Sequence, residues 1–104
     1  MSRPDISIVM PCFNEQAHVA DALEALLAQQ TDYVYEIIVV DSSSDRTPKI
    51  IESRFSDVTL FHSSTRLSCG AARNQGIRMA AGEKILFTDA DVRVPIDSHS
   101  IDVE

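Results

Sequence analysis

Four short apolar runs, each followed by polar residues, alternate along this chain with three segments of helical character. The runs cover residues 6–11, 35–41, 58–63 and 84–91. Apart from Glu36, the run at 35–41 is apolar up to Asp41, which is typical of a strand covered on both faces of a parallel sheet. Strand–helix alternation with short connections predicts a doubly wound α/β fold with right-handed crossovers. We expect the strand order 3-2-1-4.

The helices are predicted from apolar periodicity and from residues that favour helix ends. One covers residues 14–30, a shorter one lies within 42–55, and a third covers 68–82. Asn14 and Thr47 are predicted as N-caps, with Pro48 as the first helical residue of the second helix. Gly82 is predicted as the C-cap of the third helix.

Length and charge limit the class of protein. The chain has 104 residues, enough for one small domain, and a net charge of −7, which argues against nucleic acid as a partner. Its two cysteines form no Cys/His cluster, so we expect two buried free thiols and no zinc site. The N-terminus lacks the apolar core of a signal peptide. We therefore expect a cytoplasmic protein, or one at the cytoplasmic face of the membrane if a longer parent protein is anchored.

Polar residues follow every predicted strand, and in a parallel sheet these carboxyl ends share one edge. Asp41 follows the second strand, and Asp89 and Asp91 end the fourth. Arg73 lies near the start of the third predicted helix, on the same edge. Two neighbouring carboxylates repel each other unless a cation lies between them, and oxygen ligands suit Mg²⁺ or Mn²⁺. The pattern favours a divalent-cation site that holds an anionic ligand.

Three segments resemble the family 2 (GT-A) glycosyltransferases, which use nucleotide-diphosphate sugars. They are ISIVMPCFNEQAHVADALEALLAQ, EIIVVDSSSDRTPKII and AARNQGIRMAAGEKILFTDADV, in the order of that family. The resemblance implies a Rossmann-like parallel sheet, the N-terminal half of a GT-A fold. It places a nucleotide-sugar-binding subdomain at residues 1–94 and an irregular tail at 95–104, without the acceptor-binding half.

The resemblance also implies roles for individual residues. The loop after the first strand borders the nucleotide, Asp41 contacts the base or its surroundings, and Asp89 approaches the ribose. The implied nucleotide-sugar-binding residues are Pro11, Phe13, Glu15, Asp41, Arg73 and Asp89. Asp91, with Asp89, is the implied ligand of a Mn²⁺ or Mg²⁺ ion that bridges the diphosphate.

Two departures from the family pattern qualify these roles. The second motif reads DSSSDRT, one residue shorter than is common, with Ser42 where a second Asp often stands. Only 13 residues follow Asp91, so the catalytic base is unknown and is expected in a missing C-terminal half.

The expected function is metal-dependent, inverting transfer of a sugar from a UDP- or GDP-linked donor to an acceptor, with this chain holding the donor site. The alternative is a non-catalytic nucleotide-binding or protein-interaction module derived from such an enzyme. An exposed sheet edge would then favour self-association. A phosphatase-type nucleophile at Asp89 is disfavoured, because its motif normally opens a domain and here stands near the end.

Overall fold

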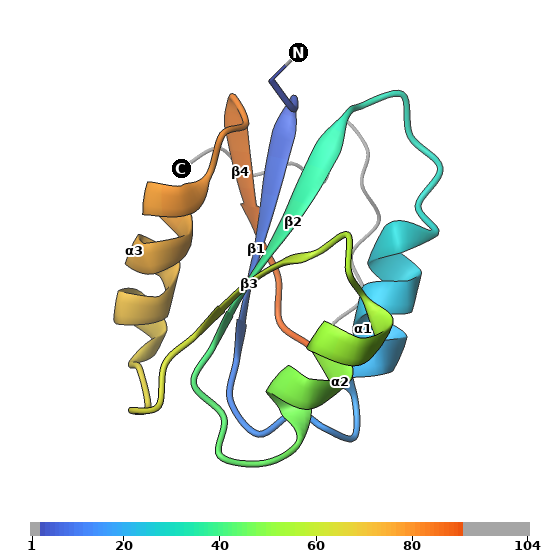
Figure 1. The fold of residues 1–104 in the computed structure, drawn as a ribbon. Coiled ribbons are helices and arrows are strands. Elements are labelled where there is room, and N and C mark those ends of the chain that lie inside the picture. The colour runs from blue at the N-terminus through green and yellow to red at the C-terminus, as the bar shows by residue number, and fades with distance from the viewer. Residues whose placement is uncertain (1–2, 91–104) are drawn as a thin grey trace.

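The computed structural model describes residues 3–90, and their four strands form one parallel sheet (Figure 1). The sheet order is β3-β2-β1-β4, so β1 lies between β2 and β4 as predicted. The strands are β1 Ile6–Cys12, β2 Tyr35–Asp41, β3 Thr59–His62 and β4 Lys84–Phe87. The predicted strand order is confirmed.

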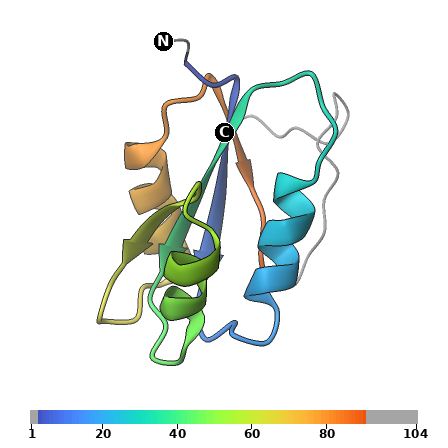
Figure 2. The same ribbon diagram turned by 45° about the vertical axis from the view of Figure 1, so that its right-hand side comes forward.

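The helices cover both faces of the sheet. α1 (Val19–Leu27) and α2 (Thr47–Arg54) lie on one face, and α3 (Cys69–Met79) lies on the other (Figures 1 and 2). This two-sided cover confirms the doubly wound α/β arrangement and explains why β1 and β2 are mostly apolar on both faces.

The central strand β1 supplies both halves of the core. Ile6, Ile8 and Met10 are fully buried in the cluster formed with α1 and α2. Val9, on the opposite face, is fully buried in the cluster under α3, where Ile38 joins it. Each fully buried aliphatic side chain contributes about 1.5–3 kcal/mol to stability. β1 is therefore the strand that contributes buried side chains to the core on both faces of the sheet.

A glycine lets α3 approach this strand closely. A Cβ atom built on Gly76 would lie 2.3 Å from Cγ1 of Val9. The helix backbone therefore packs directly against the Val9 side chain, which brings the first turns of α3 beside the carboxyl end of β1.

Two helix starts differ from the prediction. α1 begins at Val19, and Asn14 does not cap it; Asn14 has φ 52°, in the left-handed region that asparagine tolerates. α2 begins at Thr47, one residue earlier than expected. The capping acceptor there is the carboxylate of Asp45, which accepts from both the backbone N–H and the hydroxyl of Thr47.

Gly82 is not the C-cap of α3 either. The helix ends at Met79, and Ala80 follows in an extended conformation. Gly82 instead approaches β1, where an added Cβ would lie 2.6 Å from the backbone nitrogen of Ser7. Its own N–H donates to the hydroxyl of Ser7 (2.8 Å), and that hydroxyl donates to Glu36 (2.6 Å). A glycine is required by this close approach rather than by a helix end.

The last strand is shorter than predicted. β4 ends at Phe87, although the N–H of Thr88 still donates to the carbonyl of Val9 (3.1 Å). Asp91 and the expected tail at 95–104 lie outside the described residues. None of the helices within residues 3–90 is long and apolar enough to cross a membrane.

Candidate nucleotide site at the carboxyl edge of the sheet

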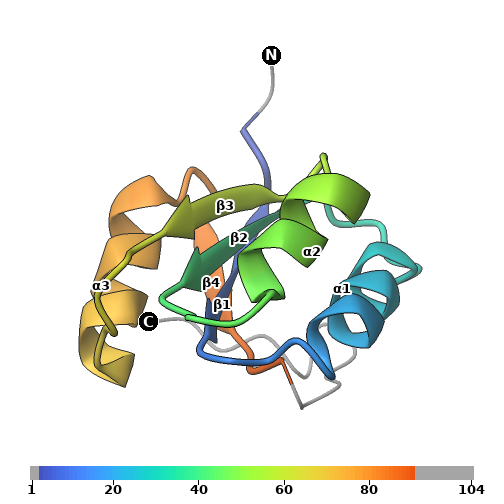
Figure 3. The same ribbon diagram turned by 60° about the horizontal axis from the view of Figure 1, so that its bottom comes forward.

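The loops that follow the strands gather at one edge of the sheet, which Figure 3 brings forward. This is where a doubly wound sheet offers a crevice, beside the strand at which the direction of winding reverses. Here that strand is β1, because β2 and β3 lie on one side of it and β4 on the other. Two cavities open at this edge, and Pro11 at the end of β1 lines both.

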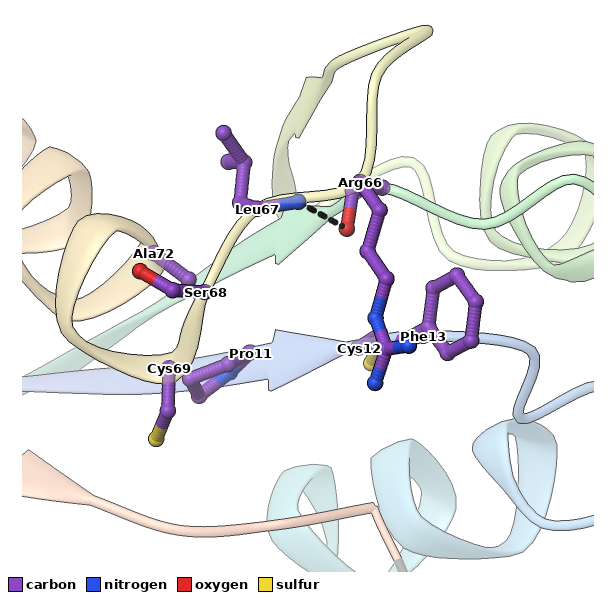
Figure 4. Close-up of a pocket in the computed structure, with 9 residues that line it drawn as sticks. Pro11, Cys12, Phe13, Arg66, Leu67, Ser68, Cys69 and Ala72 are labelled. Carbon is purple, nitrogen blue, oxygen red and sulfur yellow. Dashed lines mark hydrogen bonds between the residues drawn. The ribbon is translucent and has the colours of Figure 1, made fainter.

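The larger cavity has a volume of about 160 Å³ (Figure 4). Its walls come from the end of β1, from the start of the loop after β2 and from the segment that enters α3. The lining residues are 11–13, Ser42, 66–69 and Ala72. The hydroxyl of Ser42 accepts a hydrogen bond from the N–H of Leu67 (3.0 Å), which joins two of these walls (Figure 4).

Arg66 and Phe13 form one side of the larger cavity. The Arg66 side chain extends from the loop before α3 toward Phe13 (Figure 4), and its Cζ lies 4.0 Å from the centroid of the ring. This distance is within the range of a cation–π contact. The family resemblance implied a nucleotide-binding role for Phe13, whereas Arg66 was expected on this edge, among the polar residues after the third strand, without an assigned role.

The smaller cavity has a volume of about 40 Å³ and brings together three predicted site residues, Pro11, Arg73 and Asp89. Phe87 and Thr88 complete its lining, and Cζ of Arg73 lies 5.1 Å from the centroid of the Phe87 ring. The hydroxyl of Thr88 is buried and has no hydrogen-bond partner among the described residues. The cavity is thus small and polar, and one hydroxyl at its wall lacks a hydrogen-bond partner among the described residues.

Asp89 is the described half of the predicted metal pair. Its side chain is exposed, and within residues 3–90 no hydrogen bond or ion pair engages its carboxylate. An available carboxylate oxygen is a donor that Mg²⁺ or Mn²⁺ accepts. Asp91 lies outside the described residues, and among the residues described no three His, Cys, Asp or Glu side chains group around a metal position.

Asp41 is placed differently from the other predicted site residues. It is fully buried and lines neither cavity. One carboxylate oxygen accepts from the hydroxyl of Ser43 (2.5 Å), and the other lies 2.6 Å from Nδ1 of His62 on β3. These contacts occupy the carboxylate and give His62 a partner that the sequence did not predict.

Glu15 lies in the loop after β1, which is hydrogen-bonded to the loop after β2. The N–H of Asn14 donates to Ser43 Oγ (2.7 Å), and the N–H of Ser44 donates to Asn14 Oδ1 (2.9 Å). The N–H of Glu15 donates to Thr47 Oγ1 (3.0 Å). The Glu15 Oε2 atom itself is buried without a partner in the described part of the chain. The loops after β1 and β2 therefore hold each other in position.

The two cysteines differ, which corrects the prediction that both are buried. Cys12 is buried, and Cys69, the first residue of α3, is exposed. Burial raises the pKa of the Cys12 thiol well above its usual range, and the nearby carboxylates of Asp41 and Glu15 raise it further. Both thiols line the larger cavity.

The fold and this edge define an open, doubly wound α/β domain with a divided crevice beside β1. The profile of the family described as "Glycosyl transferase family 2" matches residues 7–99. The chain belongs to this family.

Curated relatives and solved structures agree with the assignment. An uncharacterized glycosyltransferase of Haemophilus influenzae is 35% identical over 86 residues, which cover 83% of this chain and 29% of the relative. The putative glycosyltransferase EpsH of Bacillus subtilis is 35% identical over 97 residues, covering 88% of this chain and 27% of EpsH. The chain thus spans less than a third of the length of these relatives.

Among solved structures, the mannosyltransferase PcManGT from Pyrobaculum calidifontis, in complex with GDP-Man and Mn²⁺, superposes with a TM-score of 0.77. The identity is 32%, and the match covers 91% of this chain and 30% of that one. The predicted GT-A fold is confirmed by this likeness.

Proposed function

We propose that this chain forms the donor-substrate half of a glycosyltransferase and binds a nucleotide-diphosphate sugar across the two cavities. The observation that carries the proposal is their arrangement: they share Pro11, and they lie at the strand where winding reverses. The base would occupy the larger cavity. The ribose and diphosphate would extend past the smaller one toward Asp89.

An anionic ligand would be repelled by the negative charge at this edge unless a cation binds with it. The chain carries a net charge of −7, and Asp89 adds an exposed carboxylate where the diphosphate would lie. Arg73, held against Phe87, supplies one positive charge at the same cavity. We propose that Asp89 and Asp91 hold Mn²⁺ or Mg²⁺, which would neutralise the leaving diphosphate. PcManGT, bound to GDP-Man and Mn²⁺, supports this choice of ligand and cation.

The residues of the chain would bind and orient the donor rather than activate the acceptor. Pro11 and Phe13 would border the base, Arg73 would contact the nucleotide, and Asp89 would approach the ribose and the metal. Acceptor binding, the carboxylate base and catalysis of the inverting displacement would require a further part of a longer protein, such as the relatives have.

Calorimetric titration of the purified chain with UDP and GDP, with and without Mn²⁺, tests this proposal. We expect saturable binding that requires Mn²⁺ and is lost in Asp91→Ala while the circular dichroism spectrum is unchanged. Asp57→Ala is the matched control, because it removes an exposed carboxylate from the turn before β3, at the opposite end of the strands. Failure of a folded chain to bind any nucleotide would refute the proposal and favour the interaction-module alternative.

A further inference from the structure

The polar side chains that line the larger cavity are those of two serines, two cysteines and Arg66, and only Arg66 among them is charged. Its two hydroxyl oxygens already accept: Ser42 from the N–H of Leu67 (3.0 Å) and Ser68 from the N–H of Ala71 (3.1 Å). Each hydroxyl therefore retains its proton for donation. A ligand that fits this wall should present acceptor atoms.

The carboxylate of Asp41, a hydrogen-bond acceptor, does not line this cavity. Asp41, which the family resemblance implies as a base contact, is fully buried and engaged by Ser43 and His62. A base edge that turns a ring N–H toward this cavity finds no carboxylate among the lining residues. Recognition of the base then falls to a side chain other than Asp41.

Arg66 is held in a way that leaves its donors free. Its Cζ lies 4.0 Å from the centroid of the Phe13 ring. No hydrogen bond or ion pair involving its guanidinium occurs within the described residues. A guanidinium held by a ring keeps the N–H groups that lie in its own plane available.

We propose that Arg66 selects the base, so that the site prefers nucleoside diphosphates whose base carries two adjacent acceptors. This inference rests on the proposed nucleotide-binding function. A guanidinium donates two parallel N–H groups, and guanine matches them with O6 and N7. Cytosine matches them with O2 and N3. In uracil a ring N–H lies between the two carbonyl oxygens, so uracil can accept a hydrogen bond from only one of the two parallel guanidinium N–H groups.

The test compares the affinities of GDP, CDP and UDP in the presence of Mn²⁺ by calorimetry, for the wild-type chain and two variants. We expect GDP or CDP to bind about tenfold or more tightly than UDP, the discrimination typical of a bidentate arginine. Tighter binding of GDP identifies the O6/N7 pair, and tighter binding of CDP identifies the O2/N3 pair.

Arg66→Lys separates charge from geometry, because lysine keeps the positive charge and loses the paired donors. We expect the affinity ratio to fall toward one in Arg66→Lys, with little change for UDP. Arg78→Ala is the control, since it removes an exposed arginine that is bonded to Gln75 on the same helix. UDP binding as tightly as GDP and CDP, or a ratio unchanged by Arg66→Lys, would overturn the inference and leave the proposed function standing. Absence of binding by all three nucleotides refutes the proposed function, and this inference with it.

Discussion

Replacing Gly76 by alanine tests whether the close contact between α3 and β1 sets the position of the helix. The added Cβ would lie 2.3 Å, 3.0 Å and 3.2 Å from three side-chain carbons of Val9, which is fully buried. Neither side can yield without moving the strand or the helix. Overpacking of this kind costs about 1–3 kcal/mol, and alanine returns about 1 kcal/mol of helix propensity. The difference is about 0–2 kcal/mol, and because three contacts are short at once we expect a net loss in the upper half of that range, about 1–2 kcal/mol.

Urea unfolding followed by circular dichroism measures this loss, because the chain contains no tryptophan. A loss of this size lowers Tm by roughly 5–10 °C in a chain of this length. Gly70→Ala is the matched control: it lies in the same helix, and a Cβ there meets nothing within 4 Å. We expect Gly70→Ala to be neutral or stabilising by up to about 1 kcal/mol.

A second variant assigns the loss to one contact. In a Val9→Ala background both Cγ atoms are gone, so Gly76→Ala should become neutral or stabilising. The double variant would then be more stable than the sum of the two single losses predicts, by about the loss of Gly76→Ala alone. If Gly76→Ala proves as stable as Gly70→Ala, the contact does not set the position of the helix and the reasoning is wrong.

Three further predictions concern buried and hydrogen-bonded groups. Alkylation of the folded chain should modify Cys69 and spare Cys12, whose burial raises its thiol pKa; two modified thiols in the absence of denaturant would contradict this. Burial opposes ionisation of Asp45, but hydrogen bonds from Thr47 outweigh it and lower the pKa of that carboxyl. Its stabilising effect is therefore present above the pKa of the unfolded chain and is lost as pH falls through the folded pKa. Asp45→Asn should be less stable than the wild type at pH 7 and equal to it in acid, as urea unfolding against pH would show. Thr88→Val should be neutral or stabilising by about 1 kcal/mol, because it removes a buried hydroxyl without a partner in residues 3–90; a clear loss in thermal unfolding would refute that.

Sequence patterns predicted the sheet well, because mostly apolar runs mark the strands and the order 3-2-1-4 is the usual one for a doubly wound sheet with right-handed crossovers. The same patterns misplaced the helix starts. Asn14 has the chemistry of an N-cap, but its side chain bonds to Ser44, thirty residues away. Gly82 has the position of a C-cap, but its approach to Ser7 of β1 is what requires a glycine. Local residue preference could not predict either contact, since both depend on segments distant along the chain.

The sequence was sufficient to predict which edge of the sheet carries the candidate site. It was not sufficient to predict which side chains line a cavity there. Pro11, Arg73 and Asp89 meet around one small cavity, as expected from residues that follow parallel strands or begin a nearby helix. Asp41 follows its strand as expected, yet its carboxylate is taken up by His62 on β3. Register between neighbouring strands decides that pairing, and no sequence period encodes it.

The hydrogen bonds between the loops after β1 and β2 have a consequence for building chimaeras from this family. The N–H of Asn14 reaches Ser43, and the N–H of Arg46 reaches Gln16 in the opposite direction. A loop transplanted alone from a relative would lose its partners and leave those of the resident loop unpaired. Residues 13–16 and 42–47 are therefore expected to behave as one exchangeable unit, and a graft from a relative should move both segments together.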